Sequence, residues 1–235
     1  MNAVAEKLPE SMSAVVCHAP KDYRLEERSV PKPGPEEVLI KVKSTGICAS
    51  DIKCYAGAER YWGHKNRPRY CQAPVTPGHE FAGEVVALGE GAGEKYGLTI
   101  GDHAVSEQIV PCWKCEYCKM GAYWMCAVHD IYGFRQRTFG AWAQYMLLPR
   151  GALNYKVPAS LPWHYAAFIE GNDKELNIHG AHLSPRCYPV AIRMIEQGLL
   201  PMDEIVTHRL PLEDYQKGID LVLSGLTSVK VTLEP

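Results

Sequence analysis

The sequence predicts a mainly β protein with helices near its C-terminus. Several short segments are rich in valine, isoleucine, alanine and aromatic residues and are separated by proline, glycine and aspartate, a pattern typical of strands. Apolar residues at helical spacing appear only late in the chain. With 235 residues, 46% of them hydrophobic, the chain is long enough to bury a substantial core. These observations favour a β-barrel or a β-sandwich.

The predicted elements follow one another without an internal repeat. In chain order, we expect strands over 13–19, 36–47, 80–89, 101–110 and 141–149, helices over 188–200 and 212–225, and a last strand over 228–235. Gly225 is placed to end the second helix. After the sequence GEGAG (89–93), Gly97 and Gly101 interrupt any helix, so this segment is predicted to be a loop between strands.

Charge and hydropathy exclude two classes of partner. Charged residues make up 22% of the chain and the net charge is -2, so no basic surface for nucleic acid is expected. Residues 1–16 contain no basic segment followed by a long apolar run, and no stretch of the chain approaches eighteen consecutive apolar residues. We therefore expect a cytoplasmic protein that binds neither nucleic acid nor a membrane.

Four of the nine cysteines are concentrated in one short stretch. Cys112, Cys115, Cys118 and Cys126 follow the spacing C-x2-C-x2-C-x7-C. In a reducing compartment such a cluster binds metal more often than it forms disulfides, and short loops of this kind let four thiolates surround one Zn²⁺ at about 2.3 Å. An ion with four protein ligands has no position left for water or substrate. The stretch is predicted to be a structural zinc site, and the alternative is four unrelated buried cysteines.

A second pair of metal-ligating residue types lies earlier in the chain. Cys48 and His79 each follow a glycine-containing turn at the end of a predicted strand, where a side chain can point into a cleft. Taken singly, each has an ordinary explanation, because cysteine is often simply buried and a lone histidine more often satisfies a hydrogen bond. From the residues alone, the pair is an open candidate for a catalytic metal site.

Three motifs in the same order resemble the medium-chain zinc-dependent alcohol dehydrogenases. They are the turn GICASD (46–51), the segment GHEFAGEVVALGEGAGEKYGLTIGDHAV (78–105) and the four-cysteine stretch. The likeness covers residues 12–170 and 176–235 and is nearer to the polyol (sorbitol-like) branch than to the simple alcohol branch. It implies a GroES-like barrel with a catalytic zinc, a structural-zinc lobe, and a separate Rossmann domain that holds NAD(P) in the family.

The resemblance assigns roles to single residues. Cys48 and His79 match the first two catalytic zinc ligands, and the remaining ligand is Glu80 or Glu170, both of which stand where polyol-type members carry a glutamate at or near the zinc. Ser50 would accept the proton of the substrate hydroxyl. Asp51 would bond the other nitrogen of His79 and fix its tautomer; the alternative for Ser50 and Asp51 is that they cap a short helix.

Two features depart from the family pattern near this site. Thirty residues separate Cys48 from His79, more than is usual, and the excess is the basic and aromatic segment GAERYWGHKNRPRYCQ (57–72). This segment either shapes the mouth of the substrate cleft or forms a solvated surface loop. In addition, Lys53 stands where many members of the family carry the histidine that ends the proton relay.

The larger departure concerns the cofactor. Dinucleotide binding needs a strand, a G-x-G-x-x-G turn and a helix, with an acidic residue about 20 positions on. The sequence contains no such unit, and only residues 171–174 join the two parts that resemble the family. Two mononucleotide-binding halves would add roughly a hundred residues or more. We therefore expect two Zn²⁺ ions, one catalytic and one structural, but no NAD(P) site in this chain.

These observations define the expected organisation and function. A GroES-like catalytic domain over 12–170 would include a zinc lobe over 108–130; residues 171–174 would form the junction, and residues 175–235 would complete the domain as strand, helix, helix and strand. The chain would be the zinc-binding part of an alcohol or polyol dehydrogenase acting on a small polar alcohol, inactive alone. The alternative is a non-redox zinc module with weak hydrolytic activity. Strand 175–183 is expected to pair with a second copy, because unpaired strand edges recruit other chains.

Overall fold

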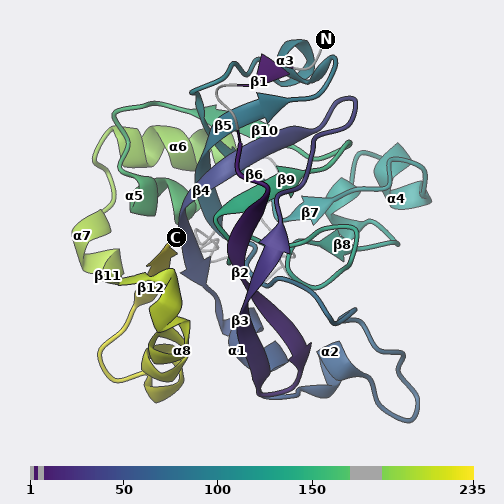
Figure 1. Cartoon of the computed structure of the whole chain (residues 1–235), viewed down its shortest axis with the longest axis vertical. Helices are drawn as coiled ribbons and strands as arrows, with labels where there is room; N and C mark the ends of the chain where they lie inside the picture. Colours follow the sequence, from purple (N-terminus) through teal and green to yellow (C-terminus); the bar gives the residue numbers. More distant parts are fainter. Residues whose placement is uncertain (1–2, 5–7, 170–186) are drawn as a thin grey trace.

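Strands dominate the computed structural model, which describes residues 3–4, 8–169 and 187–235 (Figure 1). The strands are β1 Ala3–Val4, β2 Ser11–Ala19, β3 Asp22–Ser29, β4 Val38–Ile47, β5 Phe81–Leu88, β6 His103–Ser106, β7 Ile109–Val110, β8 Asp130–Ile131, β9 Tyr145–Leu148, β10 Asn154–Val157, β11 Val206–Pro211 and β12 Lys230–Glu234. The helices are α1 Ala49–Tyr55, α2 Glu59–Trp62, α3 Ala92–Tyr96, α4 Glu116–Lys119, α5 Trp163–Ala167, α6 Tyr188–Glu196, α7 Met202–Ile205 and α8 Tyr215–Ser224, with 3-10 turns η1 Tyr123–Met125 and η3 Leu212–Asp214. The prediction of a mainly β protein with helices near the C-terminus is confirmed.

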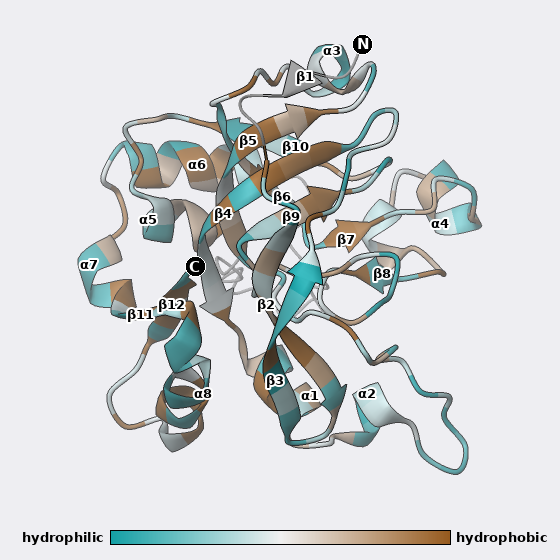
Figure 2. Cartoon of the chain, viewed as in Figure 1, coloured by the Kyte–Doolittle hydropathy of each residue, from teal (hydrophilic) through white to brown (hydrophobic). Residues whose placement is uncertain are grey.

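β4 is the centre of the main sheet. Among the described residues this sheet has the order β10-β6-β5-β4-β12-β11, and β1 and β9 join it by pairing with β5 and β4. Val38, Leu39, Ile40, Val42 and Ile47 of β4 are all buried. Because successive residues point to opposite faces, β4 is covered on both faces. In Figure 2, β5, β9 and the first part of β4 are largely brown, and α5 and α6 lie beside this sheet. The sheet therefore supplies the rigid frame from which the chemistry-bearing loops leave.

Some elements were not predicted from the sequence. β3 pairs with β2 in a separate hairpin, but its sequence DYRLEERS is mostly charged and exposed, so it lacks the apolar alternation of a half-buried strand. β11 lies between α7 and η3 and pairs in parallel with β12. The segment predicted to be a loop after GEGAG does join β5 to β6, but it contains the short helix α3, which Gly97 ends in the left-handed conformation (φ 64°).

A small lobe projects from the barrel and contains the four-cysteine stretch. It contains β7, α4, η1 and β8, and β7 pairs with β8 (Figure 1). Tyr123 anchors it, because its hydroxyl donates a hydrogen bond of 3.1 Å to the buried carboxylate of Glu107. Trp113 adds a second anchor by donating from its indole nitrogen to the carbonyl of Gly151 at 2.8 Å. The lobe is thus joined to the main body at both ends.

Trp142 packs against the turn that precedes His79. Its side chain is fully buried, and its indole nitrogen donates to the carbonyl of Gly46 at 3.2 Å. Gly78 lies against this ring with φ 97°, and a Cβ at that position would collide with the indole. Only glycine combines this backbone conformation with so close an approach. The turn before His79 is therefore held against the core.

In the described part of the chain, no helix is long and apolar enough to cross a membrane.

Candidate functional site

Strand register brings the predicted catalytic residues to one end of the sheet. In the antiparallel pair β4–β5, Thr45 lies opposite Phe81. Cys48 follows the end of β4, and His79 precedes the start of β5. Both residues therefore lie at the same end of this antiparallel pair. The backbone N–H of Gly46 donates to the carbonyl of Glu80 at 2.7 Å and ties the two segments together. Residues that are 31 positions apart in the sequence thus become neighbours.

Cys48, His79 and Glu80 form a compact group of possible metal donors. One donor atom from each residue lies within 4.8 Å of the other two. His79 and Glu80 are almost fully buried, with exposed fractions of 2% and 3%, whereas Cys48 is half-buried. A thiolate, an imidazole and a carboxylate are all ligands that zinc prefers in proteins. The group is therefore chemically suited to one zinc ion at the border between the core and solvent.

Asp51 makes two contacts that together explain its position. One of its carboxylate oxygens, Oδ2, accepts a hydrogen bond of 3.0 Å from the backbone N–H of Cys48, at the start of α1. The other oxygen, Oδ1, faces Nδ1 of His79 at 3.6 Å, and both atoms are buried without another partner among the described residues. Asp51 thus caps α1 and also faces the histidine, so the two interpretations left open by the sequence are compatible.

Ser50 faces the other side of the same imidazole. Its hydroxyl oxygen lies 3.1 Å from Nε2 of His79. Ser50 does not cap α1, because the capping contacts at the start of that helix come from Cys48 and Asp51. It also lines a cleft of about 710 Å³ at the surface. The serine hydroxyl is therefore placed between the metal-donor group and the space that a substrate would enter.

Lys230 is a further residue of this site, and the sequence analysis missed it. Its ammonium group lies 2.7 Å from Oε2 of Glu80, and both side chains are largely buried. β12 pairs with the end of β4, where Val231 lies opposite Ile47, and this register carries the preceding lysine to the site. Gly46 leaves room for the pair, because a Cβ there would collide with the Glu80 carboxylate. A lysine 150 positions away gives no local signal, so only the strand pairing identifies it.

The electrostatics of the group favour bound positive charge. Burial opposes the charged imidazolium, but the carboxylate of Asp51 and the thiol of Cys48 outweigh it and raise the pKa of His79 well above its usual value. Burial also opposes ionisation of Glu80, but Lys230 and His79 lower the pKa of that carboxyl. The side chains around His79 thus stabilise a cation, which is the property expected of a metal site.

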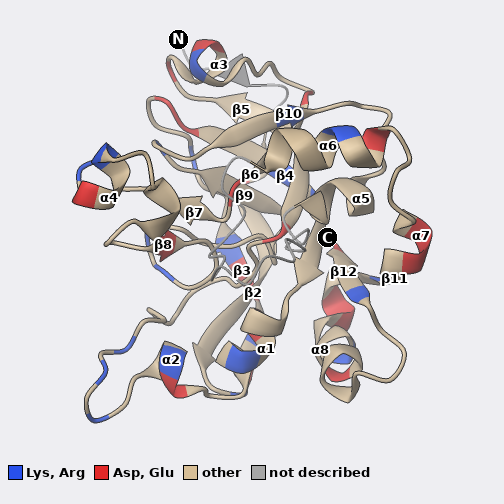
Figure 3. Cartoon of the chain, turned by 180° about the vertical axis from the view of Figure 1, so that it is seen from behind, with Lys and Arg blue, Asp and Glu red and all other residues tan. Residues whose placement is uncertain are grey.

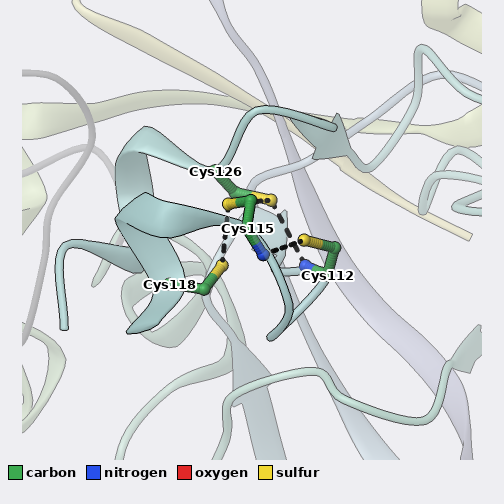
Figure 4. A group of neighbouring side chains, drawn as sticks. All are labelled: Cys112, Cys115, Cys118 and Cys126. Atoms are coloured by element: carbon green, nitrogen blue, oxygen red, sulfur yellow. Dashed lines mark hydrogen bonds between the residues drawn. The ribbon is translucent and has the colours of Figure 1, made fainter. Parts of the chain in front are cut away.

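The four cysteines of the lobe form the second donor group (Figure 4). Their sulfur atoms all lie within 4.8 Å of one another, with Cys115 and Cys118 separated by 3.5 Å and Cys115 and Cys126 by 4.0 Å. The figure shows the four side chains converging from the loop, from α4 and from the segment after η1. A set of four thiolates fits a tetrahedral zinc ion with no open position.

Backbone amides also point at these sulfur atoms. Sγ of Cys112 accepts from the N–H groups of Lys114 and Cys115 at 3.4 Å, and Sγ of Cys115 accepts from Ala127 at 3.5 Å. The Lys114 amide is the main cause of a lowered pKa at Cys112, and the Ala127 amide is the main cause that lowers the pKa of Cys115 to about 6. Donors directed at sulfur stabilise the thiolate, which is the form that binds metal.

The other described cysteines do not belong to either donor group. Cys17, Cys54 and Cys71 are at most 1% exposed and belong to one hydrophobic core cluster, with Cys54 on α1. Cys187 is half-buried at the start of α6. Glu170, the alternative ligand to Glu80, and the predicted strand 175–183 lie outside the described residues. The choice between Glu80 and Glu170 therefore stays a prediction.

The basic insertion borders the cleft that contains Ser50. Tyr61, Arg67 and Arg69 from this insertion line the cleft, and Lys53 lines it from α1. Phe134, which also lines the cleft, stacks on Tyr61 with ring centroids 5.0 Å apart. Of the two interpretations of residues 57–72, the geometry favours a segment that shapes the mouth of the cleft.

Comparison with known sequences identifies the family. The family described as "Alcohol dehydrogenase GroES-like domain" matches residues 34–159. An erythritol/L-threitol dehydrogenase from Mycolicibacterium smegmatis is 37% identical over 361 residues, which cover 99% of this chain and all of that protein. A sorbitol dehydrogenase from Halalkalibacterium halodurans is 38% identical over 154 residues, covering 65% of this chain. An L-threonine 3-dehydrogenase from Pyrococcus horikoshii is 37% identical over 164 residues, covering 69% of this chain.

The last two relatives are matched only in part. The chain covers 40% of the sorbitol dehydrogenase and 44% of the L-threonine 3-dehydrogenase, less than half of each.

Solved structures show the same fold at lower sequence identity. 2R,3R-butanediol dehydrogenase from Bacillus subtilis superimposes with a TM-score of 0.77 at 20% identity, covering 96% of this chain and 100% of that one. An alcohol dehydrogenase from Escherichia coli CFT073, in complex with NADH, gives 0.79 at 17% identity, with 97% and 100% covered. The predicted GroES-like fold is thereby confirmed, and the chain belongs to the zinc-dependent, NAD(P)-linked alcohol and polyol dehydrogenases.

Proposed function

We propose that this chain is the zinc-binding catalytic part of a polyol dehydrogenase. The observation that carries the proposal is the group of Cys48, His79 and Glu80 donor atoms within 4.8 Å, with the Ser50 hydroxyl 3.1 Å from His79 at the cleft. A second zinc would be held by the four cysteines of the lobe and would be structural. Similarity to an erythritol/L-threitol dehydrogenase and to a sorbitol dehydrogenase supports a small polyhydroxylated alcohol as the substrate class.

Each residue of the site has a definite task in this proposal. Cys48 and His79, with Glu80 or Glu170, would hold the catalytic zinc. When bound, zinc supplies Lewis-acid polarisation of the substrate hydroxyl and lowers its pKa. Ser50 would accept the hydroxyl proton, because its oxygen lies beside the donor group and also lines the cleft.

Two further residues would position these groups. Asp51 would orient the imidazole of His79 by facing Nδ1, and a carboxylate in that place also raises the basicity of the ligating nitrogen. Lys230 would compensate the buried charge of Glu80 and hold its carboxylate near the metal donors.

The proposal places the hydride acceptor outside this chain. The only glycine-rich candidate, GEGAG, joins β5 to β6, which pair antiparallel, whereas a dinucleotide-binding unit joins parallel strands. The alignment with the erythritol/L-threitol dehydrogenase runs over 361 positions and this chain has 235 residues, so more than a hundred positions of that relative lack a counterpart. Both facts support a catalytic domain that needs a cofactor domain from elsewhere.

Cobalt substitution tests the proposed open metal site without requiring turnover. Co²⁺ bound by the cleft residues would have a free coordination position, whereas Co²⁺ in the lobe would be surrounded by four thiolates. Addition of imidazole is therefore expected to change the visible absorption of the cobalt-loaded chain. The change should persist in Glu116→Gln, an exposed substitution in the lobe that leaves every proposed metal ligand in place, and disappear in Cys48→Ser. An equal change in Cys48→Ser, or no change in the unaltered chain, would refute the proposed site.

A further inference from the structure

We infer that the cleft beside Ser50 binds the phosphate group of a phosphorylated polyol. The inference rests on the proposed function and names a narrower substrate class for the same site. The cleft has a volume of about 710 Å³ and contains five basic side chains, Lys53, Arg60, Arg67, Arg69 and Arg135. No aspartate or glutamate is among the described residues that line it. A cleft in which every charged group has the same sign recruits ligands of the opposite sign.

Two of the arginines are fixed in place by the surrounding chain. Arg69 donates from Nε to the carbonyl of Cys71 at 2.7 Å, and its guanidinium lies 4.4 Å from the ring centre of Trp62. Arg135 donates from Nη1 to the carbonyl of Tyr70 at 3.0 Å. These contacts use part of each guanidinium and leave further N–H groups for a ligand. A pre-positioned guanidinium loses less side-chain entropy when an anion binds.

The other three cations have no carboxylate partner among the described residues. Glu59 directly precedes Arg60 in the sequence, but its carboxylate lies 3.7 Å from His64 and does not pair with Arg60. Asp130, which is not among the residues that line the cleft, pairs with Arg135 and Arg137. No ion pair between described residues includes Lys53 or Arg67. Their charges are therefore uncompensated within the part of the chain that the structure describes.

The number of basic side chains in the cleft favours a phosphate over a carboxylate as the ligand. A phosphate monoester carries about -1.5 to -2 charges near pH 7 and three acceptor oxygens, and arginine recognises it with paired N–H groups. Figure 3 shows one blue and one red segment on α2 and repeated blue segments on the loop that follows it. Tyr61, Tyr70 and Phe134 add aromatic surface between these cations. Ser50 lines the same cleft, so a ligand held there by its phosphate can extend a hydroxyl toward the proposed zinc site.

Calorimetric titration of the zinc-loaded chain distinguishes this ligand class from its alternatives. The probes are D-sorbitol 6-phosphate, D-sorbitol, D-gluconate and adenosine 2′,5′-bisphosphate. We expect D-sorbitol 6-phosphate to bind at least about tenfold more tightly than each of the other three, and the affinity to fall as salt is added. Equal affinity for D-sorbitol and its phosphate would overturn the inference. Tighter binding of D-gluconate or the adenosine bisphosphate would also overturn it, by indicating a carboxylate or a nucleotide phosphate.

Substitutions of cleft residues test whether D-sorbitol 6-phosphate binds in this cleft. Arg60→Gln and Arg67→Gln are each expected to weaken D-sorbitol 6-phosphate binding about tenfold, because each removes an exposed cation of the cleft. Arg193→Gln, which removes an exposed charge from α6, is the matched control and should leave the affinity unchanged. Equal losses in all three variants would show a non-specific charge effect and contradict the site. Melting curves check that each variant is folded.

The two proposals fail in different ways. If the imidazole response of the cobalt-loaded chain is present and the preference for phosphate is absent, only the phosphate inference is wrong. If the imidazole response is absent and D-sorbitol 6-phosphate still binds through Arg67, the anion site stands and the proposed catalytic metal site is wrong.

Discussion

Cys115→Ser is expected to destabilise the chain more than Cys48→Ser. A closed four-thiolate site contributes its binding free energy to folding, and this amounts to about 10 to 16 kcal/mol in zinc-finger peptides. The lobe also covers part of the main core, because Tyr123 and Cys118 pack in the same hydrophobic cluster as Trp142. Loss of the lobe zinc should therefore expose core residues. Cys48→Ser removes a ligand from an open site and should lower the melting temperature less.

Thermal melts of the two variants, with a control in the lobe, make this comparison. Glu116→Gln is the control, because the Glu116 side chain is 84% exposed and contacts only Lys119 among the described ion-pair partners. It should change the free energy of unfolding by no more than about 0.5 kcal/mol. An equal or larger loss of stability in Cys48→Ser than in Cys115→Ser would contradict a structural role for the lobe zinc.

The chain on its own is expected to bind neither NADH nor NADPH and to oxidise no polyol. Zinc polarises the hydroxyl but has no accessible redox state with which to accept a hydride. A nicotinamide must be held against the substrate carbon, and such orientation is worth about 7 to 11 kcal/mol of barrier. Among the residues that the structure describes, no glycine-rich turn joins two parallel strands and could hold it.

Titration calorimetry with NADH and NADPH, and a long assay with D-sorbitol and erythritol at high NAD⁺ and NADP⁺, measure this directly. We expect no saturable heat of binding and no formation of reduced cofactor. Micromolar binding of either nucleotide, or turnover that Cys48→Ser abolishes, would show that the chain builds a cofactor site of another kind. The cobalt experiment serves as the control that the metal site is intact in the protein tested.

The lobe was predictable because its signal is local. The four cysteines from Cys112 to Cys126 lie within one short stretch, so their spacing alone predicts that they bind one metal ion. Cys48 and His79 are different, because each has an ordinary explanation by itself. They meet only through the register of β4 with β5, which short-range patterns do not specify. Resemblance to a family, and not periodicity, made that pair recognisable.

The remaining parts depended on long-range pairing. Lys230 reaches Glu80 because β12 pairs with the end of β4, and neither strand contains a local indication of that partnership. The hairpin strand β3 was missed because only Tyr23 and Leu25 are apolar in a segment that is otherwise mostly charged. The aromatic and basic character of residues 57–72 was visible in the sequence, but the cleft that they line was not.

Zinc content tests most directly whether one chain holds two metal centres of different kinds. Purified protein should contain two zinc ions per chain, and Cys48→Ser should contain one while it keeps the lobe zinc. About one zinc per chain in the unaltered protein, with no change in Cys48→Ser, would contradict the proposed catalytic site.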